Sequence, residues 1–206
     1  MEISTAAGTA RVTLDEVAEV AEVAGGAGPA FLLVLTHGSN GGVSAPDLLA
    51  VRDAALGLGG AVARVLQPFR VAGRRAPGPA AAQDAAWLEV IAALRERHGD
   101  VPLVQGGRSN GARVACRTAL AAGARGVIAL AFPLHPPRRP EVSRAPELRG
   151  AGVPVLVING RRDPFGVPDA ADATCVHVLP RAGHDLATAA DTIGEVAADW
   201  LPRWTR

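Results

Sequence analysis

The chain has 206 residues, a length typical of one domain with a single core, and we predict one domain over residues 1–206. With 49% hydrophobic residues, 20% charged residues and a net charge of +1, its composition indicates neither disorder nor a nucleic-acid or membrane partner. All 21 basic residues are arginine and tyrosine is absent, which excludes P-loop, Schiff-base and Tyr-Lys proton-relay chemistry.

Apolar runs alternate with segments of helical spacing along the chain. Residues 9–23 fit a strand in their first half and a helix in their second, and we predict one or two antiparallel edge strands there. Continuous apolar runs then predict strands at 31–37, 61–67, 101–106, 126–132, 153–159 and 174–180. Helical spacing predicts helices near 46–58, 80–98, 111–123 and 186–201, with a short turn around 167–173. This alternation predicts an α/β protein with a mostly parallel central sheet and helices on both faces.

The predicted helix at 80–98 has an apolar face. That face is predicted to comprise Ala85, Leu88, Ile91, Ala92 and Leu94.

Two loops rich in proline and arginine follow predicted strands, at 67–80 and 132–150. Ligand sites of parallel sheets form at the carboxyl ends of the strands, so these segments fit binding loops as well as surface connections. Their arginines suggest an anionic group on the substrate, with surface solvation as the alternative. The arginines concerned are Arg70, Arg74, Arg138 and Arg139.

A Gly-x-Ser-x-Gly pentapeptide occurs at residues 107–111. Because a strand is predicted before it and a helix after it, Ser109 falls on a sharp strand-to-helix turn that can expose a nucleophilic hydroxyl. Gly107 and Gly111 let the strand and helix approach closely, and the N–H of Asn110 faces charge developing on a bound acyl group. A glycine-rich turn with a capping serine is the alternative interpretation.

A serine hydroxyl needs a base, and the chain offers five histidines. His184 follows the last predicted strand and precedes the last helix, so we predict it as the base. His98 fits a helix cap and His177 a packed strand residue. His135 lies in the second proline-rich loop and fits the rim of a cleft.

An acid that orients the base is expected at a strand end between Ser109 and His184. Asp163 lies four residues past the apolar run 153–159 and is the predicted acid. Asp169 and Asp172 are the alternatives if Asp163 only caps a turn. The order Ser109, Asp163, His184 separates this arrangement from those of two unrelated groups of serine proteases.

The tripeptide Ser-Asn-Gly occurs a second time, in "THGSNGG" at residues 36–42. A glycine-rich loop leaving an early strand can supply the second N–H of an oxyanion hole. We predict Ser39 as that donor, with Asn40 as the second choice, and His37 as the residue whose hydrogen bonds orient the loop. Taken alone, the segment also fits a plain glycine-rich turn.

The segments "THGSNGG", "GRSNGAR", "NGRRDPFG" and "AGHDL", in this order, resemble the α/β-hydrolase superfamily. The phrases "QPFRVAGRR" and "ALAFPLHPPRRPE" are similar to a small dienelactone-hydrolase-like branch. That branch is related to the hydrolase-like domain of a subunit of the non-specific lethal histone acetyltransferase complex and to a testis-expressed homologue.

The resemblance implies an eight-stranded sheet, a triad of Ser109, Asp163 and His184, and an oxyanion hole at Ser39 and Asn110. Dienelactone hydrolases carry a cysteine nucleophile, whereas this chain has Ser109, which favours ester chemistry over lactone specificity. Only about 20 residues separate the predicted strands that end at 132 and start at 153, so no lid domain is expected.

The sequence therefore predicts a cytoplasmic serine hydrolase that cleaves a small carboxylic ester, with no cofactor and no metal. Its predicted partner is a small acyl substrate, and His37, Asn40, Arg70, Arg74 and His135 are the predicted binding residues. Two alternatives stay open, a non-catalytic interaction module with the same fold and a thioesterase or peptidase with the same triad. Cys116 and Cys175 lack the paired spacing of a disulfide framework or metal site and are expected to be small core residues.

Overall fold

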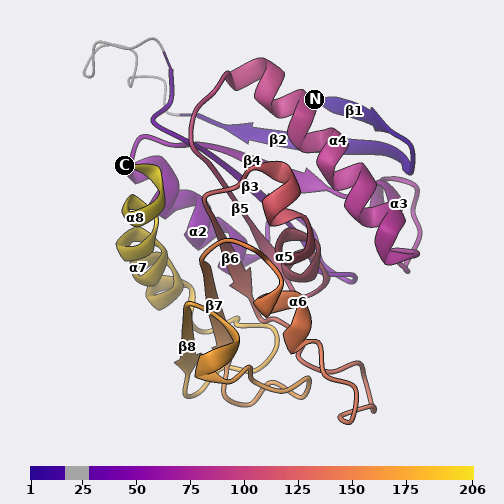
Figure 1. The fold of residues 1–206 in the computed structure, drawn as a ribbon, viewed down its shortest axis with the longest axis vertical. Coiled ribbons are helices and arrows are strands. Elements are labelled where there is room, and N and C mark those ends of the chain that lie inside the picture. The colour runs from indigo at the N-terminus through magenta and orange to yellow at the C-terminus, as the bar shows by residue number, and fades with distance from the viewer. Residues whose placement is uncertain (17–27) are drawn as a thin grey trace.

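A computed structural model describes residues 1–16 and 28–206 (Figure 1). Eight strands form one sheet in the order β1-β2-β4-β3-β5-β6-β7-β8. The hairpin of β1 (Glu2–Thr5) and β2 (Gly8–Asp15) forms one edge and pairs antiparallel to β4. The other strands are parallel: β3 (Leu32–Thr36), β4 (Ala61–Leu66), β5 (Leu103–Arg108), β6 (Gly126–Leu130), β7 (Val155–Gly160) and β8 (Cys175–Leu179).

The predicted mostly parallel sheet is confirmed, as are all six strands predicted from apolar runs. The edge strands predicted within residues 9–23 are confirmed up to Asp15, where β2 ends. The part of that prediction that covers residues 17–23 lies outside the described residues.

Helices cover both faces of the sheet, as predicted (Figure 1). The helices α2 (Pro46–Gly57), α7 (Ala190–Trp200) and α8 (Pro202–Thr205) pack on one face. The opposite face carries α3 (Pro68–Val71), α4 (Ala80–His98), α5 (Asn110–Ala122) and α6 (Ala145–Arg149). The short helix η1 (Ala170–Asp172) falls within the segment predicted as a turn.

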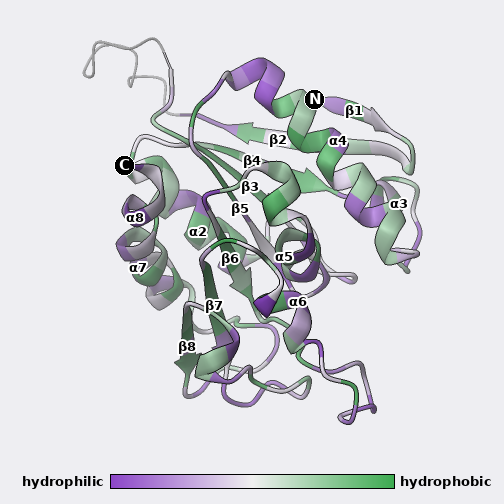
Figure 2. Cartoon of the chain, viewed as in Figure 1, coloured by the Kyte–Doolittle hydropathy of each residue, from purple (hydrophilic) through white to green (hydrophobic). Residues whose placement is uncertain are grey.

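Two apolar clusters, one on each face of the sheet, form the core. Strands β3, β6 and β7 are buried throughout, which explains why their sequences are continuously apolar and do not alternate. In Figure 2 the central strands are mainly green, whereas purple gathers on the outer helices and on the loop before α6. Cys116 is fully buried, and burial raises the pKa of its thiol; Cys175 packs half-buried against the other cluster.

The predicted apolar face of α4 needs correction, because Ala85 and Ala92 are exposed. The buried residues of this helix are Ala86, Trp87, Val90, Ile91 and Leu94. Trp87 determines which face of α4 packs against the sheet, since its ring is buried and its indole N–H donates to the side-chain oxygen of Gln105 at 2.9 Å. A tryptophan buries far more apolar area than an alanine, so its position outweighs that of Ala85.

The loops differ from prediction in three places. Helices α3 and α6 lie inside the two proline-rich loops, and each has a proline in its first turn, where the missing N–H costs nothing. The final helix starts at Ala190 and not at 186, because Leu186 has a positive φ of 53° that ends helical geometry there.

The segment from β6 to β7 contains α6 as its only helix, and within residues 28–206 no lid domain is inserted there. Among the described residues, none of the helices has the length and apolar composition required to span a bilayer.

Candidate active site

Ser109 lies between the end of β5 at Arg108 and the start of α5 at Asn110. Its φ of 53° and ψ of −114° place it in a region that residues with side chains rarely adopt. The backbone N–H of Ser109 donates to the Leu130 carbonyl at the end of β6, at 2.9 Å. The turn is therefore strained and held by its neighbouring strand, and it has the shape predicted from the pentapeptide.

The two glycines of the pentapeptide are required by close packing. A Cβ atom at Gly107 would lie 2.7 Å from the Thr36 carbonyl oxygen and 2.7 Å from the carbonyl carbon of Gly111. A Cβ atom at Gly111 would lie 2.7 Å from the same Thr36 oxygen. Strand β3 and helix α5 could not approach this closely with any larger residue, and that approach fixes where Ser109 points.

Ser109, His184 and Asp163 form one hydrogen-bonded line. The Ser109 Oγ lies 3.0 Å from His184 Nε2, and His184 Nδ1 lies 2.8 Å from Asp163 Oδ2. The Asp163 carboxylate accepts the Nδ1 proton, which leaves the Nε2 lone pair free to accept the serine proton. The structure thus brings together the three residues predicted as nucleophile, base and acid.

The loops after β7 and β8 hold the acid and the base. The side chain of Asp163 is fully buried, and its Oδ1 accepts the Phe165 N–H at 2.8 Å. The ring of Phe165 meets the His184 imidazole edge-on, with 4.5 Å between centroids. A Cβ atom at Gly160 would overlap the Ala182 carbonyl oxygen, so a glycine is needed where the His184 loop crosses β7.

The alternative acids have structural roles elsewhere. Asp169 and Asp172 form a capping box around η1, and Asp172 also pairs with Arg149 at 2.6 Å. Two of the other histidines considered as bases lie within regular elements. His98 is the last residue of α4, and His177 lies within β8.

The first Ser-Asn-Gly loop lies against the second. A Cβ atom at Gly38 would lie 3.1 Å from the Ser109 Cβ, so the two loops are in contact. Ser39 and Asn40 line the same cavity as Ser109, Asn110 and His184. The cavity has a volume of about 420 Å³. The residues predicted for the oxyanion hole therefore line one cavity together with Ser109 and His184, while Asp163 is buried behind His184.

His37 anchors this first loop from behind. Its Nδ1–H donates to the Gly38 carbonyl at 2.7 Å, and its Nε2 accepts the Gln67 N–H at 3.0 Å. The Gln67 side-chain amide in turn donates to the His37 carbonyl at 3.0 Å. Burial lowers the pKa of His37, in keeping with a neutral ring that donates at one nitrogen and accepts at the other. The prediction that His37 contacts substrate is corrected, because its side chain is buried and does not line the cavity.

Three other predicted binding residues lie outside this cavity. Arg70 is part of α3, and the exposed Arg74 lines a separate cavity beside α3 and α4. The His135 ring lies within 3.3 Å of the Val142 carbonyl, while its backbone N–H donates to the Phe165 carbonyl at 2.9 Å. The sequence placed these residues on loops at the correct edge of the sheet but could not show which way their side chains turn.

Three arginines that the sequence did not single out line the cavity instead: Arg108, Arg113 and Arg144. Arg108 and Arg113 flank the nucleophile within "GGRSNGAR", one residue before Ser109 and one helical turn after it. That spacing could have predicted both arginines as cavity residues, because the end of β5 and the first turn of α5 lie at the same edge of the sheet as Ser109. Nothing in the sequence distinguishes Arg144 from the other loop arginines.

Two of these arginines are paired with carboxylates. Arg108 lies 3.2 Å from the buried Asp47 and also donates to the His184 carbonyl at 3.0 Å. Burial raises the pKa of the Asp47 carboxyl, and the Arg108 charge opposes that rise. Arg113 makes a two-bond contact with Glu147, at 2.6 and 2.8 Å.

The third arginine differs from the other two. The guanidinium of Arg144 donates to the carbonyls of Pro133 and His135, each at 3.2 Å. Among the residues that the structure describes, no carboxylate lies within ion-pair distance of it. The cavity therefore carries one positive charge without a carboxylate partner.

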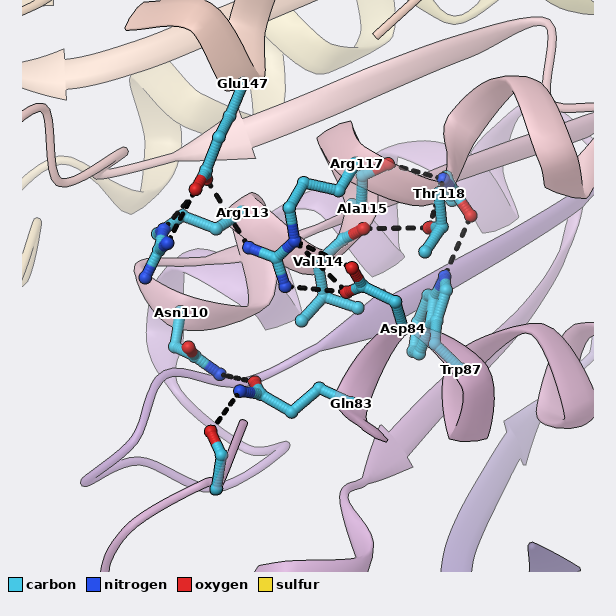
Figure 3. A network of polar contacts seen from close by, with 12 residues as sticks. Gln83, Asp84, Trp87, Asn110, Arg113, Val114, Ala115, Arg117, Thr118 and Glu147 are labelled. Carbon is cyan, nitrogen blue, oxygen red and sulfur yellow. Dashed lines mark hydrogen bonds and ion pairs between the residues drawn. The ribbon is translucent and has the colours of Figure 1, made fainter. Parts of the chain in front are cut away.

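A network of side chains supports this wall of the cavity (Figure 3). The Asn110 amide donates to the Gln83 side-chain oxygen at 2.8 Å, and Gln83 donates to the Gly78 carbonyl at 2.9 Å. Beside it, Arg117 joins Asp84 of α4 to Glu147 of α6. The network ties α4, α5 and α6 together around the first turn of α5.

Comparison with known proteins places the chain in a family. A family profile described as an alpha/beta hydrolase domain matches residues 29–199, and the chain belongs to this family. The predicted superfamily is therefore confirmed. No curated protein matches the chain.

Several solved structures share the fold at low sequence identity. An α/β serine hydrolase without a lid from Xanthomonas campestris has a TM-score of 0.76 at 17% identity, with 99% of this chain and 93% of that one covered. An α/β serine hydrolase homologue from Coxiella burnetii has a TM-score of 0.78 at 15% identity, with 98% and 96% covered. A dienelactone hydrolase from Anabaena variabilis has a TM-score of 0.75 at 16% identity, with 100% and 97% covered. These similarities extend over the whole chain and concern its fold.

Proposed function

We propose that this chain is a serine hydrolase that cleaves a small carboxylic ester through an acyl-enzyme. The observation that carries the proposal is the hydrogen-bonded line from Asp163 through His184 to Ser109, with Ser109 on a strained turn at the carboxyl edge of the sheet. A serine in an ordinary turn needs neither a positive φ nor a histidine that is itself oriented by a buried carboxylate.

In the proposed reaction, the Ser109 Oγ attacks the ester carbonyl carbon while His184 Nε2 takes the serine proton. The carbonyl electrons move to the oxygen and return as the C–O bond to the alcohol breaks, and His184 delivers its proton to that alcohol. A water molecule then attacks the acyl carbon with His184 again as base, which frees the acid and restores Ser109. Asp163 keeps its charge throughout and stabilises the imidazolium.

The oxyanion would be held by the backbone N–H groups of Ser39 and Asn110. Support comes from their position in the cavity of Ser109, from the contact between Gly38 and Ser109, and from the location of Asn110 at the start of α5. Each such donor contributes about 3 kcal/mol to lowering the barrier in enzymes of this type.

We also propose that the substrate carries an anionic group, which Arg144 binds. This replaces the earlier assignment to Arg70, Arg74, Arg138 and Arg139, because none of these four arginines lines the cavity. A half-buried guanidinium without a carboxylate partner gains most from a carboxylate on the ligand.

Paired esters test this assignment. Arg144→Gln is expected to lower kcat/KM for a p-nitrophenyl hemisuccinate about tenfold or more, while the neutral p-nitrophenyl butyrate changes less than twofold. Arg138→Gln removes one charge from the same exposed loop and serves as the control. Equal losses in both variants would reduce the effect to general electrostatic steering and refute a binding role for Arg144.

Turnover of three acyl compounds tests the function itself. The protein is assayed with p-nitrophenyl acetate, an acetyl thioester and an acetyl anilide of matched acyl group, and the ester is expected to have the highest kcat/KM. A thioester or anilide preference would favour the thioesterase or peptidase alternative. Absence of turnover for all three would favour a non-catalytic interaction module.

A further inference from the structure

A second cavity, of about 180 Å³, lies between α3, α4 and the N-terminal hairpin. Its walls are mainly apolar and include the side chains of Phe69, Ala86, Trp87 and Val90. The polar side chains that line it are those of Gln67, Gln83 and Arg74. The triad uses none of these residues.

The two glutamines connect this cavity to the predicted oxyanion hole. Gln67 hydrogen-bonds to His37, which anchors the loop that carries Ser39. Gln83 accepts a hydrogen bond from the side chain of Asn110 at 2.8 Å (Figure 3). Because Asn110 lines the triad cavity and Gln83 lines the apolar one, this neutral hydrogen bond joins a wall of one cavity to a wall of the other.

The size of the second cavity limits what it can hold. An apolar cavity of about 150 Å³ binds benzene. A cavity of about 180 Å³ therefore fits one ring or an aliphatic chain of about six carbons, and not a long lipid chain.

We propose that this apolar cavity receives the hydrocarbon end of the acyl group while the ester carbonyl lies at Ser109. The inference rests on the proposed hydrolase function and adds the class of acyl group, medium-length aliphatic or single-ring aromatic. The acyl chain passes Asn110 once the Gln83 side chain turns away, and the rest of the substrate occupies the triad cavity beside Arg144.

A series of p-nitrophenyl esters from acetate to decanoate tests the proposal. For the unmodified protein, kcat/KM is expected to rise from acetate to hexanoate and to fall again at decanoate. Each methylene group that leaves water contributes up to about fourfold, so a rise of about tenfold or more is expected by hexanoate.

Matched substitutions on α4 locate the effect. Ala86→Leu fills the cavity from a buried position, and Ala82→Leu fills it from an exposed position that does not strain the core. Both substitutions are expected to lower kcat/KM for the hexanoate ester about tenfold. Turnover of the acetate ester is expected to stay within twofold of the unmodified protein. Ala85→Leu adds the same side chain at an exposed position outside the cavity and is expected to retain the gain.

The outcomes separate the two proposals. Acetate turnover without any preference for hexanoate, or the same loss of preference in Ala85→Leu, would overturn the acyl assignment and leave the hydrolase function standing. Absence of ester turnover in the unmodified protein would contradict the hydrolase function and, with it, this inference. A hexanoate preference that only Ala82→Leu and Ala86→Leu abolish would support it.

Discussion

Two loops with the same Ser-Asn-Gly tripeptide leave adjacent strands of the sheet, yet of their two serines it is Ser109 whose hydroxyl lies within hydrogen-bond distance of a histidine. Strands β3 and β5 are parallel neighbours, with Thr36 opposite Gly107, so both loops emerge at the same edge. After β5 the chain turns directly into α5 at Asn110, which forces Ser109 to a φ of 53° and points its Oγ at His184. After β3 the chain continues through a longer loop to α2 at Pro46. Ser39 lies in a turn of that loop and does not have a positive φ.

Both serines are followed by Asn-Gly in sequence, so their different backbone geometry comes from the connection that follows each of them. A short turn into a buried helix gives Ser109 its strained backbone, whereas we propose that the longer loop over the same edge presents the backbone N–H of Ser39. Four experiments test whether the two loops have different roles.

The two serines should respond very differently to alanine. Ser109→Ala is expected to lower kcat for p-nitrophenyl acetate by about 10⁴-fold or more, because the reacting oxygen is lost. Ser39→Ala is expected to stay within about twofold, because its backbone N–H is kept. Initial rates with thermal unfolding as the control check both, and comparable losses would contradict the contrast.

Asp163→Asn should be almost as damaging. An asparagine amide can donate to His184 Nδ1, which leaves the proton on Nε2 and the ring unable to accept from Ser109, so kcat is expected to fall by about 10³ to 10⁴-fold. Asp169→Asn keeps a capping residue at η1 and is expected to retain activity. A loss in Asp169→Asn as large as that in Asp163→Asn would refute the assignment of the acid.

Ser39→Pro removes the N–H that Ser39→Ala keeps. Loss of one oxyanion donor is expected to lower kcat by about 10² to 10³-fold with a smaller change in KM, since the donor acts mainly on the transition state. Steady-state kinetics of the two Ser39 variants provide the comparison. Equal activity in Ser39→Pro and Ser39→Ala would remove Ser39 from the oxyanion hole.

The smallest effect concerns His37, the anchor of the first loop. Burial lowers the pKa of His37 in the folded protein, so the unfolded chain binds a proton near pH 6.5 while the folded protein does not. Stability contributed by neutral His37 is therefore lost as the pH falls below about 6.5, with a slope of at most about 1.4 kcal/mol per pH unit.

Urea unfolding between pH 7.5 and 5 measures that slope. In His37→Asn the part of the slope that belongs to His37 should disappear, although the variant is less stable at every pH because the bonds to Gly38 and Gln67 change. An unchanged slope would show that His37 does not resist protonation in the folded protein.

Much of this architecture could be predicted from the sequence, because its evidence is local. Apolar runs gave the six parallel strands, and the pentapeptide between a strand and a helix placed Ser109 on its turn. The order of Ser109, Asp163 and His184 then selected residues at strand ends, which a parallel sheet brings to one edge.

The binding residues could not be predicted in the same way. Arg70, Arg74 and His135 lie at the expected edge, but the direction of their side chains depends on helices α3 and α6. These short helices lie in proline-rich segments that the sequence analysis treated as loops. The predicted apolar face of α4 differs from the observed one for a similar reason. The contact between Trp87 and Gln105, which shows that Trp87 points inward, joins residues of two different elements and cannot be recognised from local sequence.

Labelling with a fluorophosphonate, followed by peptide mass spectrometry, tests whether Ser109 is the nucleophile. The reagent forms a covalent bond only with a serine whose hydroxyl is activated by a base. We expect one label on the peptide that contains Ser109, the same label in Ser39→Ala, and none in Ser109→Ala. Absence of label in the unmodified protein, or label retained in Ser109→Ala, would contradict the assignment of Ser109 as the nucleophile.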